Sequence, residues 1–282
     1  MTRQQKKTLK MALSYLVIVL IGCLLLFPIA WMISCAFKTN EEIFGSIALL
    51  PKSFSIQNFV DGWKSAGSYT YLTYFLNSFA LVVPTTVLTI ASSALVAYGF
   101  ARFEFPFKKQ LFALLLATLM LPNSVVIIPR YVLFNKFGWV DSYMPWWVPA
   151  ILACYPFFIY QLIQVMRSIP RDLDESAYID GCSTFRVFWQ ILLPLMKSSL
   201  FSAGLFQFLW TYNDYFNSLI FINSVKKYTV SLALRLSVDA ESVVVWGRVM
   251  AMACVAVLPL VLLFFAAQKY FVEGIATSGL KG

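Results

Sequence analysis

Six apolar runs, each long enough to cross a lipid bilayer, constrain this chain more than any other feature of its sequence. A helix needs about 20 predominantly apolar residues to cross the hydrocarbon core. Backbone groups inside lipid must also be hydrogen-bonded within the protein. The runs therefore predict an all-α, polytopic membrane protein with six transmembrane helices rather than a β-barrel, which would show short alternating segments. The predicted spans are approximately Met11–Phe37, Tyr71–Phe100, Gln110–Phe134, Pro145–Met166, Ser199–Ile222 and Arg248–Phe271.

The composition agrees with this prediction and excludes several classes of protein. Hydrophobic residues make up 60% of the chain and charged residues only 12%, which is more apolar than a water-soluble domain tolerates. The net charge of +9 comes from Lys and Arg at the ends of apolar runs, which indicates membrane-flanking charge and no nucleic-acid partner. The chain has no His and no CxxC pair among its five cysteines, so we expect no catalytic residue, no metal site and no cofactor bound by this chain.

The distribution of basic residues predicts which way the chain crosses the membrane. With the N-terminus inside, thirteen of the 22 Lys and Arg fall on the cytoplasmic side, including the short turn from Arg102 to Lys109. The basic segment before Met11 resembles the start of a signal peptide, but the run that follows is longer than the 7–15 residues of a secretory core. We therefore expect an uncleaved first span and cytoplasmic N- and C-termini.

Three loops stand out within a single predicted transmembrane domain, 1–282. Loops 38–70 and 223–247 are predicted to be external, and loops of this length are usually ordered and functional. The loop 168–195 is predicted to be cytoplasmic and has the pattern of two short helices. Ser168 can cap the first helix, Gly181 can end it in a left-handed conformation, and Ser183 or Thr184 can cap the second. The loop is thus predicted to be a helix, a glycine elbow and a second helix.

The loop 168–195 also carries a spaced motif. It consists of an acidic residue followed by two small residues, then a glycine, then an Ile-x-Leu-Pro sequence: Glu175, Ser176, Ala177, Gly181, Ile191, Leu193 and Pro194. This spacing resembles the EAA loop of the membrane subunits of binding-protein-dependent ABC importers. Ser176 stands where the family usually has Ala, a small change in volume.

The resemblance covers nearly the whole chain and is closest to the carbohydrate-uptake ABC permeases, the group containing the smaller inner-membrane subunit of the maltose transporter. It is carried by Phe37-Lys38-Thr39 in the first external loop, by Tyr98-Gly99-Phe100-Ala101-Arg102-Phe103 at the end of the second span, and by Met120-Leu121-Pro122 in the third. In the fifth span, Trp210-Thr211-Tyr212-Asn213-Asp214-Tyr215 is similar to the family's Trp-Asn-Glu/Asp segment. Thr211 and Tyr212 are extra residues there.

The resemblance implies a type I ABC importer permease fold in a bacterial plasma membrane. A second homologous permease completes a heterodimer, two ATPase subunits bind the cytoplasmic side, and an extracytoplasmic solute-binding protein delivers a sugar, expected to be an oligosaccharide. ATP and Mg²⁺ belong to the ATPase subunits, so this chain is a non-catalytic translocation subunit surrounded by membrane lipid. The residues expected to couple ATPase closure to alternating access are Glu175, Ser176, Ala177, Asp180 and Gly181.

A second group of residues is a candidate for the substrate pathway. Asp214 is the one acid predicted within a span, where a charge should face a cavity or a partner, and aromatic faces beside it suit sugar stacking. The candidates are Trp210, Tyr212, Asn213, Asp214, Gln207 and Asn77. Two other readings stay open for Asp214, namely solvation at the outer interface and a structural contact with the second permease. In the resembled subunit, the loop that corresponds to 223–247 reaches into the binding protein.

Three alternative functions are less consistent with the sequence. Gly274-x-x-x-x-Gly279 resembles a phosphate-binding loop, but Leu280 stands at the required Lys position, so no ATP hydrolysis by this chain is expected. An ion-coupled secondary transporter would need intramembrane charges as ion sites, and beyond Asp214 the spans offer few. It remains the second hypothesis, and a membrane-embedded enzyme is the third.

Overall fold

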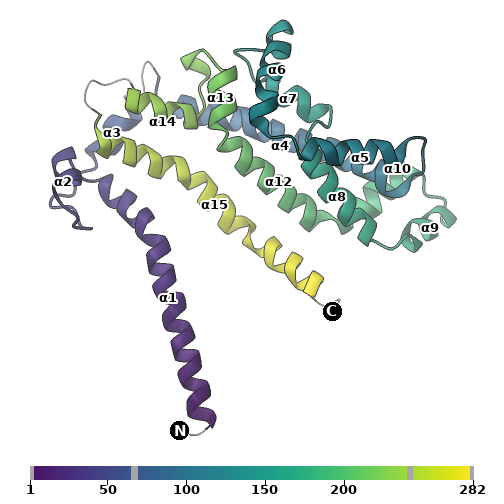
Figure 1. The fold of residues 1–282 in the computed structure, drawn as a ribbon, viewed down its shortest axis with the longest axis horizontal. Helices are drawn as coiled ribbons and strands as arrows, with labels where there is room; N and C mark the ends of the chain where they lie inside the picture. The colour runs from purple at the N-terminus through teal and green to yellow at the C-terminus, as the bar shows by residue number, and fades with distance from the viewer. Residues whose placement is uncertain (1–2, 65–68, 240–243, 280–282) are drawn as a thin grey trace. The chain divides into compact units, whose positions relative to one another are not determined.

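The computed structural model describes residues 3–64, 69–239 and 244–279, whose regular elements are helices (Figure 1). The chain forms two compact units, Met1–Tyr71 with Ala233–Leu258 and Leu72–Leu232 with Pro259–Gly282. The prediction of one transmembrane domain over 1–282 stays a prediction. The helices are α1 (Arg3–Cys35), α2 (Asn40–Gly45), α3 (Gln57–Lys64), α4 (Tyr71–Arg102), α5 (Lys108–Leu119), α6 (Asn123–Lys136), α7 (Met144–Ile151), α8 (Pro156–Ser168), α9 (Asp172–Ile179), α10 (Thr184–Val187), the π-helix η1 (Phe188–Leu192), α11 (Leu193–Leu195), α12 (Lys197–Tyr212), α13 (Tyr215–Phe221), the 3₁₀ helix η2 (Val225–Lys227), α14 (Val230–Asp239) and α15 (Trp246–Gly279).

The lengths and hydropathy of these helices confirm an all-α, polytopic membrane protein. Within the described ranges, four segments are long and apolar enough to cross a membrane by themselves: Lys10–Cys35, Tyr71–Arg102, Met144–Ser168 and Trp246–Gln268. Two bent helix pairs bring the number to six if each pair is one span: Lys108–Leu119 with Asn123–Lys136, and Thr184–Leu195 with Lys197–Tyr212. The predicted cytoplasmic position of the two termini stays a prediction.

The third predicted span, Gln110–Phe134, is not one straight helix. α5 ends at Leu119, α6 begins at Asn123, and the two axes meet at 104°. Pro122 occupies the N-cap position of α6 with an extended backbone, φ −68° and ψ 141°. Because proline has no N–H and disfavours helical geometry in the residue before it, the helix cannot continue through this point.

The fifth predicted span, Ser199–Ile222, is also wrong as a continuous helix. α12 ends at Tyr212, and α13 begins two residues beyond its C-cap, Asn213. The Asp214 side chain accepts a hydrogen bond from the Asn217 N–H and so caps α13. An aspartate that satisfies a free N–H starts a new helix more readily than it continues an old one.

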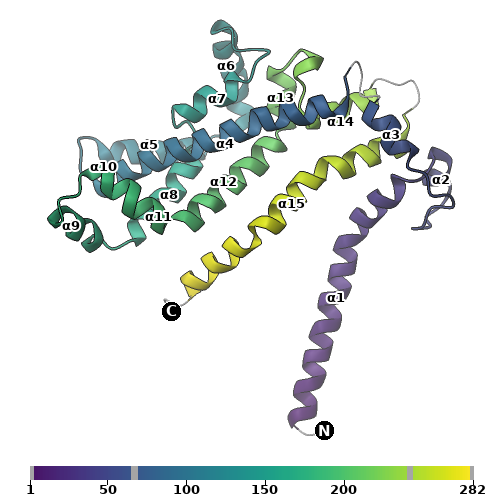
Figure 2. The ribbon, with the colours of Figure 1, turned by 180° about the vertical axis from the view of Figure 1, so that it is seen from behind.

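The core of the unit Leu72–Leu232 with Pro259–Gly282 is formed where α4, α8 and the segment 177–196 meet. Buried side chains from Ala94 to Ala101 on α4 pack with those from Ile159 to Met166 on α8 and with Ala177, Val187 and Phe188. Figure 2 shows α4, α8 and α12 running side by side in this unit. The segment 168–195 is therefore part of a core rather than a free connection.

The other unit, Met1–Tyr71 with Ala233–Leu258, packs around the end of α1. The spanning window of α1 has 0% of its residues buried, whereas Lys38 just beyond it is 1% exposed, donates to the Ala48 carbonyl and lies 4.6 Å from the centre of the Trp31 ring. Asn58 Nδ2 donates to the Ala36 and Lys38 carbonyls at 3.0 and 2.9 Å. Of the predicted external loops, 38–70 holds α2 and α3, and 223–247 holds η2 and α14; their residues 65–68 and 240–243 lie outside the described residues.

Gly247 has no room for a side chain in this unit. A Cβ added there would lie 2.5 Å from the Lys38 carbonyl oxygen and would also collide with the Asn58 side chain. We expect Gly247→Ala to displace the backbone and to cost at least the ~1–3 kcal/mol typical of overpacking, measured as a lower thermal unfolding midpoint of the purified chain in detergent. Gly45→Ala is the matched control, because nothing lies within 4 Å of a Cβ at that position. Equal midpoints for the two variants would contradict this packing.

Candidate functional site

The first helix of the loop 168–195 is α9, and it begins later than the sequence suggests. Ser168 does not cap it, because α8 continues to Ser168 and the Ser168 hydroxyl donates to the Val165 carbonyl at 2.7 Å. Arg171 occupies the N-cap position without a side-chain cap. The first turn of α9 instead carries Asp172, Asp174 and Glu175, whose negative charges suit the positive end of the helix dipole.

Gly181 ends α9 as predicted. Its φ is +80°, in the left-handed region that glycine adopts without strain. The Gly181 N–H donates to the Tyr178 carbonyl at 3.0 Å and the Cys182 N–H to the Ala177 carbonyl at 2.9 Å, which is the Schellman pattern of hydrogen bonds at a helix C-terminus. The Ser183 hydroxyl then accepts the Arg186 N–H at 3.4 Å and caps α10. The predicted helix, elbow and second helix are confirmed, with Ser183 as the cap.

The second helix of the loop is not uniform. It comprises α10, the π-helix η1 and α11, after which the chain bends by 77° into α12. A π-helical turn adds a residue to the helix and changes which side chains face the core. Val187, Phe188 and Leu192 are buried, while Phe185 and Trp189 are exposed and stack with ring centres 6.3 Å apart.

A buried ion pair fastens this loop to the end of α4. Arg102 Nε lies 2.6 Å from Asp174 Oδ2, and the two side chains are 5% and 9% exposed. Arg102 Nη2 also donates to the Ile169 carbonyl at 3.1 Å, and Tyr98 donates its hydroxyl to the Thr184 carbonyl at 3.0 Å. α4 therefore holds the segment before α9, α9 itself and the start of α10.

Sequence reasoning missed this ion pair. It counted Arg102 only among the membrane-flanking charges and gave Asp174 no partner. One sequence feature indicated that Asp174 would be buried: it lies three residues before Ala177, so the two share a helix face. That face is the buried one, with Asp174 and Ala177 each 6% exposed.

The five predicted coupling residues do not share one surface. Glu175, Ser176, Asp180 and Gly181 are exposed, whereas Ala177 packs into the core of its own chain. The Ser176 hydroxyl donates to the Asp172 carbonyl at 2.7 Å, which satisfies it within α9. The exposed part of the loop is completed by large apolar side chains, namely Ile179 (86% exposed), Phe185 (67%) and Trp189 (62%).

Asp214, the centre of the predicted substrate pathway, has partners in its own chain. Its Oδ2 accepts the Trp146 indole N–H at 3.1 Å, and its Oδ1 accepts the Asn217 backbone N–H at 3.1 Å. Asn217 Nδ2 also donates to both carboxylate oxygens, and Asn217 Oδ1 accepts Arg130 Nη2 at 3.2 Å. The carboxylate thus joins α7 and α13, and through Asn217 it is linked to Arg130 on α6.

The other pathway candidates have separate environments. Gln207 is 2% exposed and donates to Thr211 Oγ1 at 3.0 Å, and Tyr212 is buried and stacks on Phe208 with ring centres 5.9 Å apart. Trp210 is half exposed, and Asn213 is exposed. Asn77 lies on α4 and donates to the Lys226 carbonyl at 2.7 Å. The candidates therefore differ in exposure and in hydrogen-bond partners.

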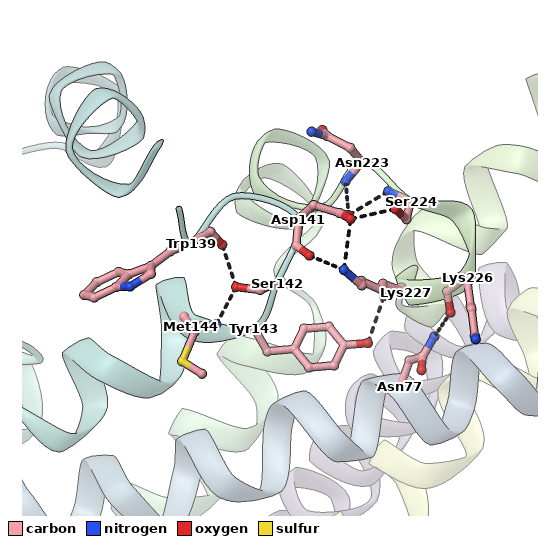
Figure 3. A network of polar contacts seen from close by, with 10 residues as sticks. All are labelled: Asn77, Trp139, Asp141, Ser142, Tyr143, Met144, Asn223, Ser224, Lys226 and Lys227. Carbon is pink, nitrogen blue, oxygen red and sulfur yellow. Dashed lines mark hydrogen bonds and ion pairs between the residues drawn. The ribbon is translucent and has the colours of Figure 1, made fainter. Parts of the chain in front are cut away.

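A polar network on Asp141 holds the start of the predicted external loop 223–247 (Figure 3). Asp141 Oδ1 accepts the Asn223 and Ser224 backbone N–H groups at 3.0 and 2.8 Å, and Oδ2 accepts the Ser224 hydroxyl at 2.6 Å and Lys227 Nζ at 2.9 Å. The Tyr143 hydroxyl donates to the Lys227 carbonyl at 2.9 Å. The network therefore connects the turn between α6 and α7 to η2.

The electrostatics of this network favour the ionised carboxylate. Burial raises the pKa of Asp141, but the hydrogen bonds from Ser224, Lys227 and Asn223 outweigh it and hold the pKa well below its usual range. Sequence reasoning did not single out Asp141. The sequence feature that could have identified it is the pair Asp141-Ser142 just before the start of α7. Aspartate tolerates the positive φ of 59° that this position requires.

Comparison with known proteins places this chain among membrane transport components. The family described as "Binding-protein-dependent transport system inner membrane component" matches residues 90–277. The chain is 35% identical to a probable ABC transporter permease protein, YurM, of Bacillus subtilis, over 91% of this chain and 84% of that protein. It is 30% identical to the trehalose/maltose transport system permease protein MalG of Thermococcus litoralis, over 99% of both chains.

A solved structure has the same fold. It is a chain of a bacterial ABC transporter involved in the import of the acidic polysaccharide alginate, with a TM-score of 0.82 over 96% of this chain and 99% of that chain. At 16% identity this likeness concerns the fold. Within the described part of the chain, no group of three or more His, Cys, Asp or Glu could hold a metal ion.

We predict that Asp174→Ala destabilises the chain far more than removal of a neighbouring charge. The substitution leaves the Arg102 guanidinium buried without its carboxylate, which typically costs about 3–5 kcal/mol. Thermal unfolding of the purified chain in detergent measures the loss. Asp172→Ala, on the same helix and exposed, removes the same charge and should change the unfolding midpoint little. Similar losses in the two variants would show that the ion pair contributes no more than a surface charge.

A second prediction concerns the Asp141 network. Asp141→Asn removes the charge that Lys227 contacts, so we expect faster proteolysis of the segment 223–229 in reconstituted vesicles. Because the folded-state pKa lies below the ordinary value of 3.8, the wild-type network is fully formed above about pH 4 and is lost only as the pH falls through the lowered pKa. Wild-type protection should therefore be equal at pH 5 and pH 7.

The control for this variant is Glu41→Gln, which neutralises an exposed acid in the predicted loop 38–70. It should leave the proteolysis of 223–229 unchanged. A wild-type segment that becomes sensitive between pH 7 and pH 5, or a variant as protected as the wild type, contradicts the role given to Asp141.

Proposed function

The chain belongs to the family of binding-protein-dependent transport system inner membrane components, and on that premise we propose that it is one of two permease subunits of an ATP-driven ABC importer for an oligosaccharide. The observation that carries the proposal is the loop 168–195, a glycine-hinged helix pair fixed to the end of a spanning helix by a buried ion pair. A loop held in this way is stiff enough to transmit a displacement to the spanning helix α4. A connection without a partner would need no buried anchor.

The partners follow from this role. A second, homologous permease forms a heterodimer with this chain, two ATPase subunits bind ATP and Mg²⁺ on the cytoplasmic side, and a solute-binding protein delivers substrate outside. The exposed Glu175, Ser176, Asp180 and Gly181, with Ile179 beside them, offer the ATPase a surface of mixed apolar and acidic character. Ala177 contributes by letting α9 pack closely on its own core.

A sugar is the substrate class that the relatives favour. The Thermococcus litoralis protein, which matches this chain over 99% of its length, is named for trehalose and maltose. Of the pathway candidates, we propose Trp210 and Asn213 as the groups available to substrate, since both are exposed. Asp214, Asn77, Gln207 and Tyr212 act by holding helix ends in place, as their contacts within the chain indicate.

An ion-coupled secondary transporter finds no support here. Such a transporter needs intramembrane charges free to bind and release an ion. Asp214 is instead engaged as the cap of α13 and as the acceptor of the Trp146 indole N–H. Its hydrogen bonds give it a structural role.

The proposal predicts that the left-handed elbow at Gly181 is required for coupling. In the importer reconstituted with its ATPase pair and binding protein, Gly181→Val should reduce ATP-driven sugar uptake and binding-protein-stimulated ATP hydrolysis about tenfold, because a side chain costs roughly 1–2 kcal/mol in this conformation and distorts the elbow. Gly181→Asn should retain more activity, since asparagine tolerates the conformation.

Gly138→Val is the matched control. Gly138 also has a positive φ, +70°, with nothing within 4 Å of a Cβ, but it lies between α6 and α7. It should lower thermal stability to a similar extent while leaving ATP-driven uptake coupled. Uptake that needs no ATP and is abolished by an ionophore would overturn the proposed function.

A further inference from the structure

In the unit Leu72–Leu232 with Pro259–Gly282, the ends of α4 and α8 lie near the start of α5 (Figure 2). A basic pocket is lined by residues of these three helices and of the segments that follow α4 and α8. Its volume is about 420 Å³, and its lining includes four cationic side chains, Arg102, Lys108, Arg167 and Arg171, with one acid, Glu104. Nothing in the coupling role of the loop requires so many positive charges in one hollow.

The charges of this pocket are only partly compensated. Lys108 Nζ pairs with Glu104 at 2.9 Å, and Arg102 pairs with Asp174. Arg171 donates to the Ala101 carbonyl at 3.3 Å, and the Arg167 guanidinium lies 5.1 Å from the centre of the Phe112 ring. Among residues 3–64, 69–239 and 244–279, no carboxylate forms an ion pair with Arg167 or Arg171. Neither guanidinium group is neutralised by a direct ion pair, and each has further N–H donors for an external anion.

The surroundings of the pocket match the boundary between lipid headgroups and hydrocarbon. α4 is a spanning helix that ends at Arg102, and α8 ends a spanning segment at Ser168. Large apolar side chains on the α4–α5 turn and the first turn of α5 are exposed, including Phe107 (72%) and Leu111 (46%). A basic hollow beside an exposed apolar strip can hold a charged headgroup while acyl chains lie along the strip.

We propose that this pocket binds the phosphate of an anionic phospholipid headgroup. Arginine guanidinium groups donate paired hydrogen bonds that suit phosphate oxygens, and Lys108 adds a point charge. The apolar strip favours a lipid over a free anion, which would gain nothing from Phe107 and Leu111. Because Arg102 and Arg171 also hold the loop 168–195 to α4, a bound headgroup reduces the repulsion among the cations at this junction.

The experiment measures lipid retention by the full chain, without reference to transport. The chain is extracted from vesicles of phosphatidylcholine containing a minor fraction of phosphatidylglycerol, and the retained lipid is counted by native mass spectrometry. Arg167→Gln and Lys108→Gln should each lower phosphatidylglycerol retention about fivefold, because each removes a charged donor that lines the pocket and contacts the headgroup phosphate. Lys109→Gln is the matched control, because Lys109 is exposed, adjacent in sequence and absent from the pocket lining.

Further measurements test whether the bound anion is a lipid headgroup or free phosphate, and whether the pocket binds the ATPase instead of a lipid. Inorganic phosphate at equal concentration should not displace the lipid; if it does, the pocket is a free-anion site and the lipid proposal fails. Equal retention by Arg167→Gln and Lys109→Gln also overturns it. If Arg167→Cys cross-links to the ATPase in assembled importer, the pocket is part of a protein interface and the proposal is wrong, although the proposed function then stands.

Discussion

Backbone hydrogen bonding inside lipid is the constraint on which the rest of this structure depends. A chain that cannot leave N–H and C=O groups unpaired in hydrocarbon must cross it as helix. Its helices therefore break only where a particular residue prevents the helix from continuing or starts a new one. Pro122 breaks the third span because it has no N–H to give and an extended backbone. Asp214 breaks the fifth because its carboxylate replaces the missing acceptor of a new helix. At the second break the Asp214 carboxylate accepts the freed Asn217 N–H, whereas α6 begins at the first break without a side-chain cap.

Charged side chains also hold loops of this chain against its helices. The Arg102–Asp174 pair is nearly inaccessible to water, and the desolvation of its two charges offsets much of their attraction. Removing one partner is costly, and this makes the position of the loop 168–195 relative to α4 well defined. The carboxylate of Asp141 plays a similar part at η2, where two backbone N–H groups and Lys227 converge on it.

The sequence was sufficient for those features that depend on local pattern. The apolar runs predicted six spans, and Gly181 with Ser183 predicted the elbow, because a left-handed C-terminus and a serine cap are encoded within a few residues. The apolar runs alone did not locate the breaks within the third and fifth spans, since hydropathy does not register the backbone of Pro122 or the capping preference of Asp214. The Arg102–Asp174 pair could not be read from the sequence, because its partners are 72 positions apart. The three-residue spacing of Asp174 and Ala177 indicates only that they share a helix face and does not identify Arg102 as the partner. Ala177 was expected to contact a partner but packs into the core of its own chain. The sequence alone does not show which face of α9 packs against α4 and α8.

α4 connects the two anchored regions. Asn77, near its start, holds the Lys226 and Tyr228 carbonyls beside the Asp141 network, and Arg102, its last residue, holds the loop 168–195. About 25 residues separate the two contacts, which is about 38 Å along a helix, enough to cross the hydrocarbon core. A displacement of the loop 168–195 must therefore move α4 or break the buried ion pair. Because breaking it costs several kcal/mol, the coupling role proposed for this loop would act through α4, whose other end contacts the segment 223–229.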